Sequence, residues 1–93
     1  MNRQICMDLG ETRHVQLLVK NIKGTDFTIT SAIWLLQDKY GKEAESRGDC
    51  AISDHVLDAL ITPQKSGVYM LKYVYQIMDE TLIDIIDVVV NGC

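Results

Sequence analysis

Residues 68–77 read VYMLKYVYQI, and this stretch decides the fold. The residues of one parity are all aromatic or apolar, namely Tyr69, Leu71, Tyr73, Tyr75 and Ile77. The other parity includes Lys72 and Gln76. Because successive side chains of a strand point to opposite faces, the stretch predicts a long strand with one buried face. Residues 81–90, TLIDIIDVVV, follow a short turn and are rich in β-branched side chains, which disfavour a helix. The two segments predict a C-terminal hairpin.

Turn-forming residues divide the rest of the chain into strand-sized apolar pieces. These turn signals fall at residues 10–11, 23–26, 40–41, 47–49, 53–55, 63–67 and 78–80. Alternation also predicts strands at residues 5–9 and 15–19. Short strands separated by regularly spaced turns are typical of an all-β sandwich. The sequence therefore predicts an antiparallel β-sandwich of about seven strands.

Two segments are also compatible with short helices. Residues 31–38 have a serine at the start and Gly41 beyond the end, which suits a capped helix, and residues 53–60 are similarly ambiguous. A strand is preferred for the first because residues 27–29 lead into it without a break. A strand is preferred for the second because Pro63 closes it as part of a corner. The helical alternative would make the fold α+β.

Length and charge narrow the classes of function. The 93 residues suit one domain spanning 1–93, with 47% hydrophobic and 24% charged residues as in globular proteins. The net charge of −4, with scattered lysine and arginine, argues against partners such as nucleic acid or an anionic membrane surface. No apolar stretch approaches the ~20 residues of a membrane span, and residues 1–10 do not resemble a signal peptide. We therefore expect synthesis in the cytoplasm.

The three cysteines are Cys6, Cys50 and Cys93. An odd number without CxxC spacing favours free thiols over a metal site or a disulfide. The alternative that remains open is a Cys6–Cys50 pair in an exported product.

A corner before the long strand resembles a feature of immunoglobulin-like sandwiches. In that fold, a tyrosine near the start of a late strand bonds back to the main chain of the corner, as Gly67 and Tyr69 suggest here. Trp34 occupies an early central strand. Leu71 stands two residues after Tyr69, where antibody domains carry a disulfide cysteine, and Leu17 or Leu18 is the candidate for the other position. The resemblance implies a sandwich whose core lacks the inter-sheet disulfide.

The whole chain also resembles the small immunoglobulin-like modules encoded by bacteriophages and prophages of Gram-positive bacteria, including N-terminal domains of upper baseplate proteins. Four segments carry this resemblance, at residues 5–10, 32–41, 63–69 and 79–84. It implies a structural or assembly role in a virion, tail or baseplate, and the virion as a final location. An adhesion or carbohydrate-binding module of the same fold is the alternative.

Candidate catalytic and metal-binding residues have simpler structural explanations. His14 and His55 are the only histidines, and the Ser53, Asp54 and Asp58 around His55 are typical of a polar turn. The sequence contains no Gly-x-Ser-x-Gly elbow and no paired zinc-ligand spacing. We therefore predict that the chain is not an enzyme and binds no cofactor or metal.

The acidic and aromatic residues suggest two further kinds of site, one for calcium and one for a sugar. The acidic residues of the last hairpin could bind calcium; they are Asp79, Glu80, Asp84 and Asp87. Asp84 and Asp87 would point to opposite faces of a strand, however, so a charged sheet edge that discourages unwanted strand pairing is the favoured interpretation. Trp34 and the tyrosines could form a sugar-binding platform. Trp34, Tyr69 and Tyr73 fall on core parities, however, and only Tyr40 lies in a turn. A small-molecule ligand is therefore not expected.

Two strands are apolar on both faces. Ile33 and Leu35 flank Trp34 on the opposite face, and Ile83 and Ile85 oppose the other apolar residues of the last strand. Such strands are usually covered on both sides. These four residues are candidate interface residues for protein partners, in a homo-oligomer or a virion assembly, although a loop or terminal segment of the chain could also cover them.

Overall fold

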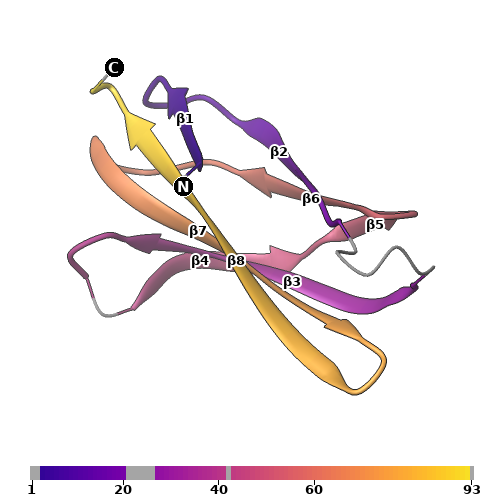
Figure 1. The fold of residues 1–93 in the computed structure, drawn as a ribbon. Coiled ribbons are helices and arrows are strands. Elements are labelled where there is room, and N and C mark those ends of the chain that lie inside the picture. Colours follow the sequence, from indigo (N-terminus) through magenta and orange to yellow (C-terminus); the bar gives the residue numbers. More distant parts are fainter. Residues whose placement is uncertain (1–2, 21–26, 42, 93) are drawn as a thin grey trace.

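The computed structural model describes residues 3–20, 27–41 and 43–92, and within them the chain forms eight strands and no helix. The strands are β1 (Arg3–Met7), β2 (Arg13–Leu18), β3 (Ile29–Asp38), β4 (Ala44–Asp49), β5 (Ala51–Ser53), β6 (Val56–Ile61), β7 (Gly67–Ile77) and β8 (Glu80–Val90). They build two sheets, one of five strands in the order β1-β8-β7-β3-β4 and one of three in the order β2-β6-β5 (Figure 1). The predicted all-β sandwich is confirmed.

Several details differ from the sequence prediction. Residues 31–38 lie in β3 and residues 56–60 in β6, so the helical alternative is wrong for both segments. The structure has eight strands rather than about seven, and β1 pairs with β8 in parallel, whereas the other strand pairs are antiparallel. The predicted turn at residues 23–26 lies outside the described residues.

The turn predicted at residues 47–49 is wrong, because these residues form the end of β4. Gly48 is paired with Trp34 of β3, and a Cβ atom built on Gly48 would lie 2.9 Å from the indole Nε1. Gly48 therefore leaves room for the indole ring, a role that a local turn signal cannot distinguish from chain reversal.

One core fills the space between the two sheets. Four of the five residues that define the predicted fold are in it: Leu17 is 1% exposed, Leu71 0%, Tyr69 2% and Trp34 8%. The fifth, Gly67, is exposed at the start of β7, where its φ of 130° favours glycine. Leu17 belongs to the three-stranded sheet and Leu71 to the five-stranded sheet. Aliphatic side chains thus occupy the positions where the resemblance placed disulfide cysteines. The alternation of β7 is confirmed, because its odd-numbered residues from Tyr69 to Tyr75 are buried.

Tyrosine hydroxyls connect the sandwich at two levels. The Tyr69 hydroxyl accepts a hydrogen bond from the Lys65 backbone N–H (3.1 Å) and donates one to Glu45 Oε1 (2.8 Å). This is the predicted tyrosine corner, extended to β4 by Glu45. Deeper in the core, the Tyr73 hydroxyl donates to the Val15 carbonyl (2.7 Å) and joins β7 to β2 of the other sheet. These three bonds satisfy polar atoms that burial would otherwise penalise.

The two described cysteines differ in state, and Cys93 lies outside the described residues. Cys50 is a buried free thiol, as predicted. Cys6 takes part in a disulfide bond, so the prediction of a free thiol there is wrong. Because Cys50 is free, the Cys6–Cys50 pair is wrong as well.

Met78 occupies a strained position in the β7–β8 turn. Ile77 pairs with Glu80, so Met78 and Asp79 form a two-residue loop, and Met78 has φ 57°. A loop with positive φ only at its first residue favours glycine there. We expect Met78→Gly to raise the free energy of unfolding by about 0.5–1 kcal/mol, because the side chain is 83% exposed and contributes little packing. Urea unfolding followed by circular dichroism measures this change.

The matched control is Asp79→Gly in the same loop. Asp79 is not among the described residues with positive φ, so glycine relieves no strain there and should lower stability slightly. Equal effects of the two substitutions would contradict the argument from backbone strain.

Candidate interaction surface

The outer face of the five-stranded sheet carries an apolar surface that crosses three strands. In one row Val74 of β7 pairs with Ile33 of β3 and with Ile83 of β8. In the next row Lys72 pairs with Leu35 and Ile85. We name these six residues the outer stripe. The partly buried Val68, Met70 and Val89 continue it along the same face.

The four candidate interface residues come together in this stripe. Ile83 is 60% exposed, Ile85 46% and Ile33 41%, whereas Leu35 is half-buried. No segment within residues 3–20, 27–41 and 43–92 covers these three isoleucines. Contiguous exposed apolar side chains on a sheet face are typical of contact sites. Lys72 and Val74 were not among the predicted interface residues, although their parity in β7 places them on the face opposite the buried tyrosines.

Charged residues surround the stripe and also occupy its centre. Arg47 and Asp49 of the edge strand β4 pair with Leu35 and Ile33, so they lie at one side. At the other end, Asp87 of β8 is close to Lys39, with Nζ and Oδ2 3.9 Å apart. Lys72 is the cation within the stripe itself. The surface therefore has an apolar body, a mixed rim and one central positive charge.

The outer face of the smaller sheet is more polar. Leu18 and Leu60 are 51% and 49% exposed there, but Gln16 and the pair of His14 and Asp58 lie on the same face. Isolated exposed leucines among polar neighbours are common on protein surfaces. The outer stripe is therefore the stronger candidate for an interaction surface.

The two histidines lie in separate, structural contacts. Nδ1 of His14 is 2.8 Å from Oδ2 of Asp58, which joins neighbouring strands β2 and β6. The His55 ring stacks on Phe27 with centroids 4.0 Å apart, and its Nε2 lies 3.1 Å from the Phe27 carbonyl oxygen. Within the described residues, neither histidine is hydrogen-bonded to a serine, threonine or cysteine.

The acidic residues of the last hairpin are separated by the sheet. Asp84 accepts a hydrogen bond from the Tyr75 hydroxyl (2.7 Å), and Asp87 faces Lys39 on the opposite side. The carboxylate of Asp84 and burial of the ring raise the pKa of Tyr75, burial being the larger cause. Over residues 3–20, 27–41 and 43–92, no three His, Cys, Asp or Glu side chains are grouped to hold a metal ion.

Most aromatic residues are in the core. Trp34, Tyr69, Tyr73 and Tyr75 are at most 8% exposed, whereas Tyr40 in the turn after β3 is 88% exposed. A stacking platform for a sugar needs aromatic faces open to solvent. Among the described aromatic residues, Tyr40 is the one that offers such a face.

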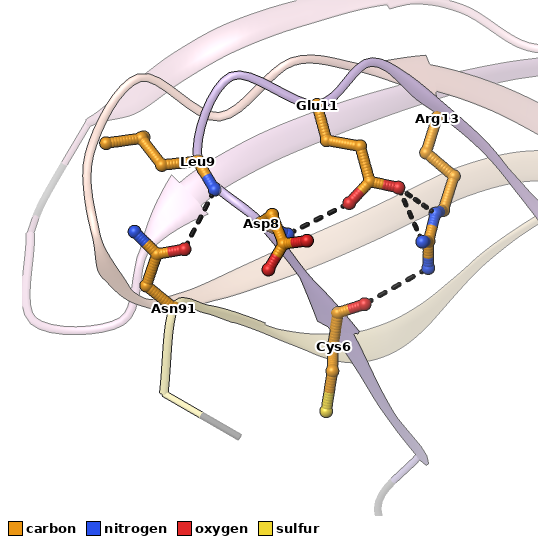
Figure 2. Close-up of polar contacts among 6 residues, drawn as sticks. All are labelled: Cys6, Asp8, Leu9, Glu11, Arg13 and Asn91. Carbon is orange, nitrogen blue, oxygen red and sulfur yellow. Dashed lines mark hydrogen bonds and ion pairs between the residues drawn. The ribbon is translucent and has the colours of Figure 1, made fainter.

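A polar clasp connects the β1–β2 turn to the end of β8 (Figure 2). Glu11 accepts hydrogen bonds from the Asp8 backbone N–H (2.9 Å) and from Arg13 Nε (2.9 Å), and Arg13 Nη1 donates to the Cys6 carbonyl (3.0 Å). Asn91 Oδ1 accepts from the Leu9 backbone N–H (3.0 Å). The hydrogen bonds from the Asp8 backbone and Arg13 lower the pKa of the Glu11 carboxyl.

The clasp lines an open pocket of about 410 Å³, bounded by Cys6, Met7, Asp8, Glu11, Arg13 and Asn91. All three guanidinium nitrogens of Arg13 already donate to Glu11 or to the Cys6 carbonyl. The cation is therefore engaged within the clasp rather than directed at a ligand. These contacts were not foreseen from the sequence, because Asn91 lies far along the chain from Leu9.

No family model matches this chain, and searches of curated proteins and of solved structures give no match either. Among the described residues, no helix is long and apolar enough to cross a membrane.

Proposed function

We propose that this chain is a non-enzymatic structural module that assembles with protein partners through the outer stripe. The observation that carries the proposal is the exposure of Ile83, Ile85 and Ile33 in adjacent rows of one sheet face. Burying such side chains removes apolar area from water, which is the main favourable contribution to protein association. The partner can be another copy of the chain or another protein of the same assembly.

Strand order and the corner support an immunoglobulin-like assignment. The larger sheet contains β3, β7 and β8 with β1 and β4 at its edges, and β2, β6 and β5 form the other layer. Tyr69 makes the expected backbone bond at the corner, and Trp34 of β3 packs in the core. A central tryptophan and a tyrosine corner are hallmarks of that fold.

The resemblance of residues 5–10, 32–41, 63–69 and 79–84 to phage-encoded modules supports a role in a virion, such as a tail or baseplate component. A rigid sandwich that presents one exposed apolar face, the outer stripe, suits an assembly role. Carbohydrate binding is the weaker alternative because the core buries Trp34, Tyr69, Tyr73 and Tyr75.

Site-specific photo-crosslinking tests the proposed surface. A photoreactive amino acid at position 83 or 85, in chain produced within the organism that encodes it, should cross-link to one stoichiometric protein. We expect Ile85→Arg, with the photoreactive group at 83, to reduce the cross-linked product about tenfold, because it puts a charge in an apolar contact. Mass spectrometry identifies and quantifies the product.

The matched control places the same group at Gln16, which is exposed on the outer face of the smaller sheet. It should give no defined product. A cross-linked protein from position 16 but none from 83 or 85 would contradict the proposal, and a virion component as partner would support the assembly role.

A further inference from the structure

We propose that the outer stripe binds a protein surface that is apolar and carries one carboxylate opposite Lys72, in preference to the same stripe of a second copy. This inference rests on the proposed function and specifies the chemistry of its partner. It follows from the position of one cation, Lys72, on an otherwise apolar face.

Lys72 lies at the centre of the stripe. Its cross-strand neighbours are Leu35 and Ile85, and the residues two positions away on β7 with the same parity are Met70 and Val74. The side chain is already partly buried, and it forms no ion pair within the part of the chain that the structure describes. A partner that covers the stripe removes water from this ammonium group. The cost of that desolvation is offset only if the partner supplies an acceptor, and a carboxylate is the strongest one.

A second copy does not supply that acceptor. In a two-fold dimer with stripe against stripe, central residues meet their own counterparts, so the two Lys72 side chains approach each other. The carboxylates of this face are Asp49 on the edge strand β4 and Asp87, which already faces Lys39. Like charges brought together in a desolvated contact disfavour the wrong partner. Lys72 therefore selects against centred self-association.

The face is large enough for a specific contact of the weak or transient class. Between Val68 and Val74 each row crosses three to five strands, because β1 pairs only with residues 86–90 of β8, β4 only with residues 33–37 of β3 and β3 only with residues 69–77 of β7. With strands about 4.8 Å apart and residues about 3.4 Å apart, the face spans roughly 20 × 24 Å, or about 480 Å² on each partner and about 950 Å² in total. At this size, one unpaired central charge is enough to decide which surface binds.

The chain itself provides a probe for the missing carboxylate. Lys72→Glu presents the same stripe with a carboxylate at its centre. Sedimentation equilibrium should show wild type alone and Lys72→Glu alone as monomers, and an equimolar mixture as a heterodimer that binds at least about tenfold more tightly than either self-pair. The heterodimer should weaken as salt concentration rises. Lys72→Met, with no central charge, should form a homodimer that salt does not weaken.

The outcomes separate this inference from the proposed function. If wild type alone dimerises as tightly as the mixture, or if only Lys72→Met dimerises, the carboxylate requirement is wrong while the stripe remains an association surface. If the mixture and Lys72→Met are both monomeric, the carboxylate inference is wrong, because a carboxylate supplied opposite Lys72 brings about no association. The proposed function is then decided separately, by the cross-linking from positions 83 and 85.

Two controls test whether association depends on the position of the charge and on the outer stripe. Lys65→Glu makes the same charge change at an exposed position in the corner before β7, and its mixture with wild type should stay monomeric. Ile85→Arg introduced into both members of the heterodimer should abolish it. Circular dichroism of each variant must match wild type, and the outward position of residue 72 favours retention of the fold.

Discussion

Replacing Gly48 with alanine is expected to lower the free energy of unfolding by about 1–3 kcal/mol, the usual range for overpacking. The new Cβ would lie 2.9 Å from Cζ2 and Nε1 of Trp34, closer than van der Waals contact allows. Trp34 is 8% exposed and packed in the core, so the indole cannot move away without disturbing its neighbours. Denaturant unfolding measures the loss, and fluorescence of Trp34, the single tryptophan, reports the displacement of the ring.

The sign of the effect discriminates between packing and backbone preference. In an ordinary strand position alanine is more favourable than glycine by roughly 0.5–1 kcal/mol, so Gly48→Ala would stabilise the protein if the indole did not matter. A double-mutant cycle with Trp34→Phe provides the control. The smaller ring should reduce the cost of the alanine, and equal costs in both backgrounds would refute the explanation.

Alkaline pH is expected to unfold this protein over the range from about pH 9 to pH 12. Burial raises the pKa of the Cys50 thiol from 9.0 to about 11, with Asp58 and Asp49 adding to the effect. Burial, together with the hydrogen bond to Glu45, raises the pKa of Tyr69 from 10.0 to about 12. Burial also raises the pKa of Tyr73 and Tyr75. These groups hold their protons in the folded chain at pH values where the unfolded chain releases them.

The direction of the change follows from proton linkage. Below pH 9 both states bind these protons, so the stability is fully present. As pH rises through the unfolded pKa values, the unfolded state binds fewer protons, and stability falls until the folded groups also ionise. Allowing for solvent screening, each pKa shift contributes about 1–2 kcal/mol to the free energy of unfolding. Several shifts together approach the roughly 5–15 kcal/mol that is the total free energy of unfolding of a small domain.

Urea unfolding at pH 8, 9, 10 and 11 tests this expectation. Stability should decrease with each step above pH 9. Cys50→Ala should reduce the loss of stability that begins near pH 9, and Tyr69→Phe should reduce the loss above pH 10. Tyr69→Phe also removes the hydrogen bonds to Lys65 and Glu45, so its stability is compared with its own value at pH 8. Constant stability from pH 8 to pH 11 would show that these groups are not held neutral by the fold.

Local alternation was enough to predict the long strand and its buried face. Side chains in a strand alternate between faces with a period of two, so the aromatic set of β7 could be assigned to the core without knowing its neighbours. The same reasoning placed Ile33 and Leu35 on the face opposite Trp34, and Ile83 and Ile85 on the outer face of the last strand. It could not show that these two pairs flank one strand and form a single stripe.

Turn signals predicted the structure less well, because glycine occurs both where the chain reverses and where a strand must leave room for a neighbouring side chain. Residues 47–49 have the composition of a turn, yet they belong to β4. The glycine at position 48 leaves room for the Trp34 ring of the neighbouring strand and does not reverse the chain. A local pattern contains no information about a ring that is supplied by another strand.

The sequence by itself determined the class of fold, the buried residues of its central strands and the candidate interface residues, because these depend on periodicity and side-chain chemistry. Only the tertiary structure decided which strands adjoin, that β1 pairs with β8 in parallel, and that Asn91 joins the clasp of the β1–β2 turn. These are contacts between segments distant in the chain. The central position of Lys72 in an uncovered apolar face is a property of the same kind, because it requires the register of three strands.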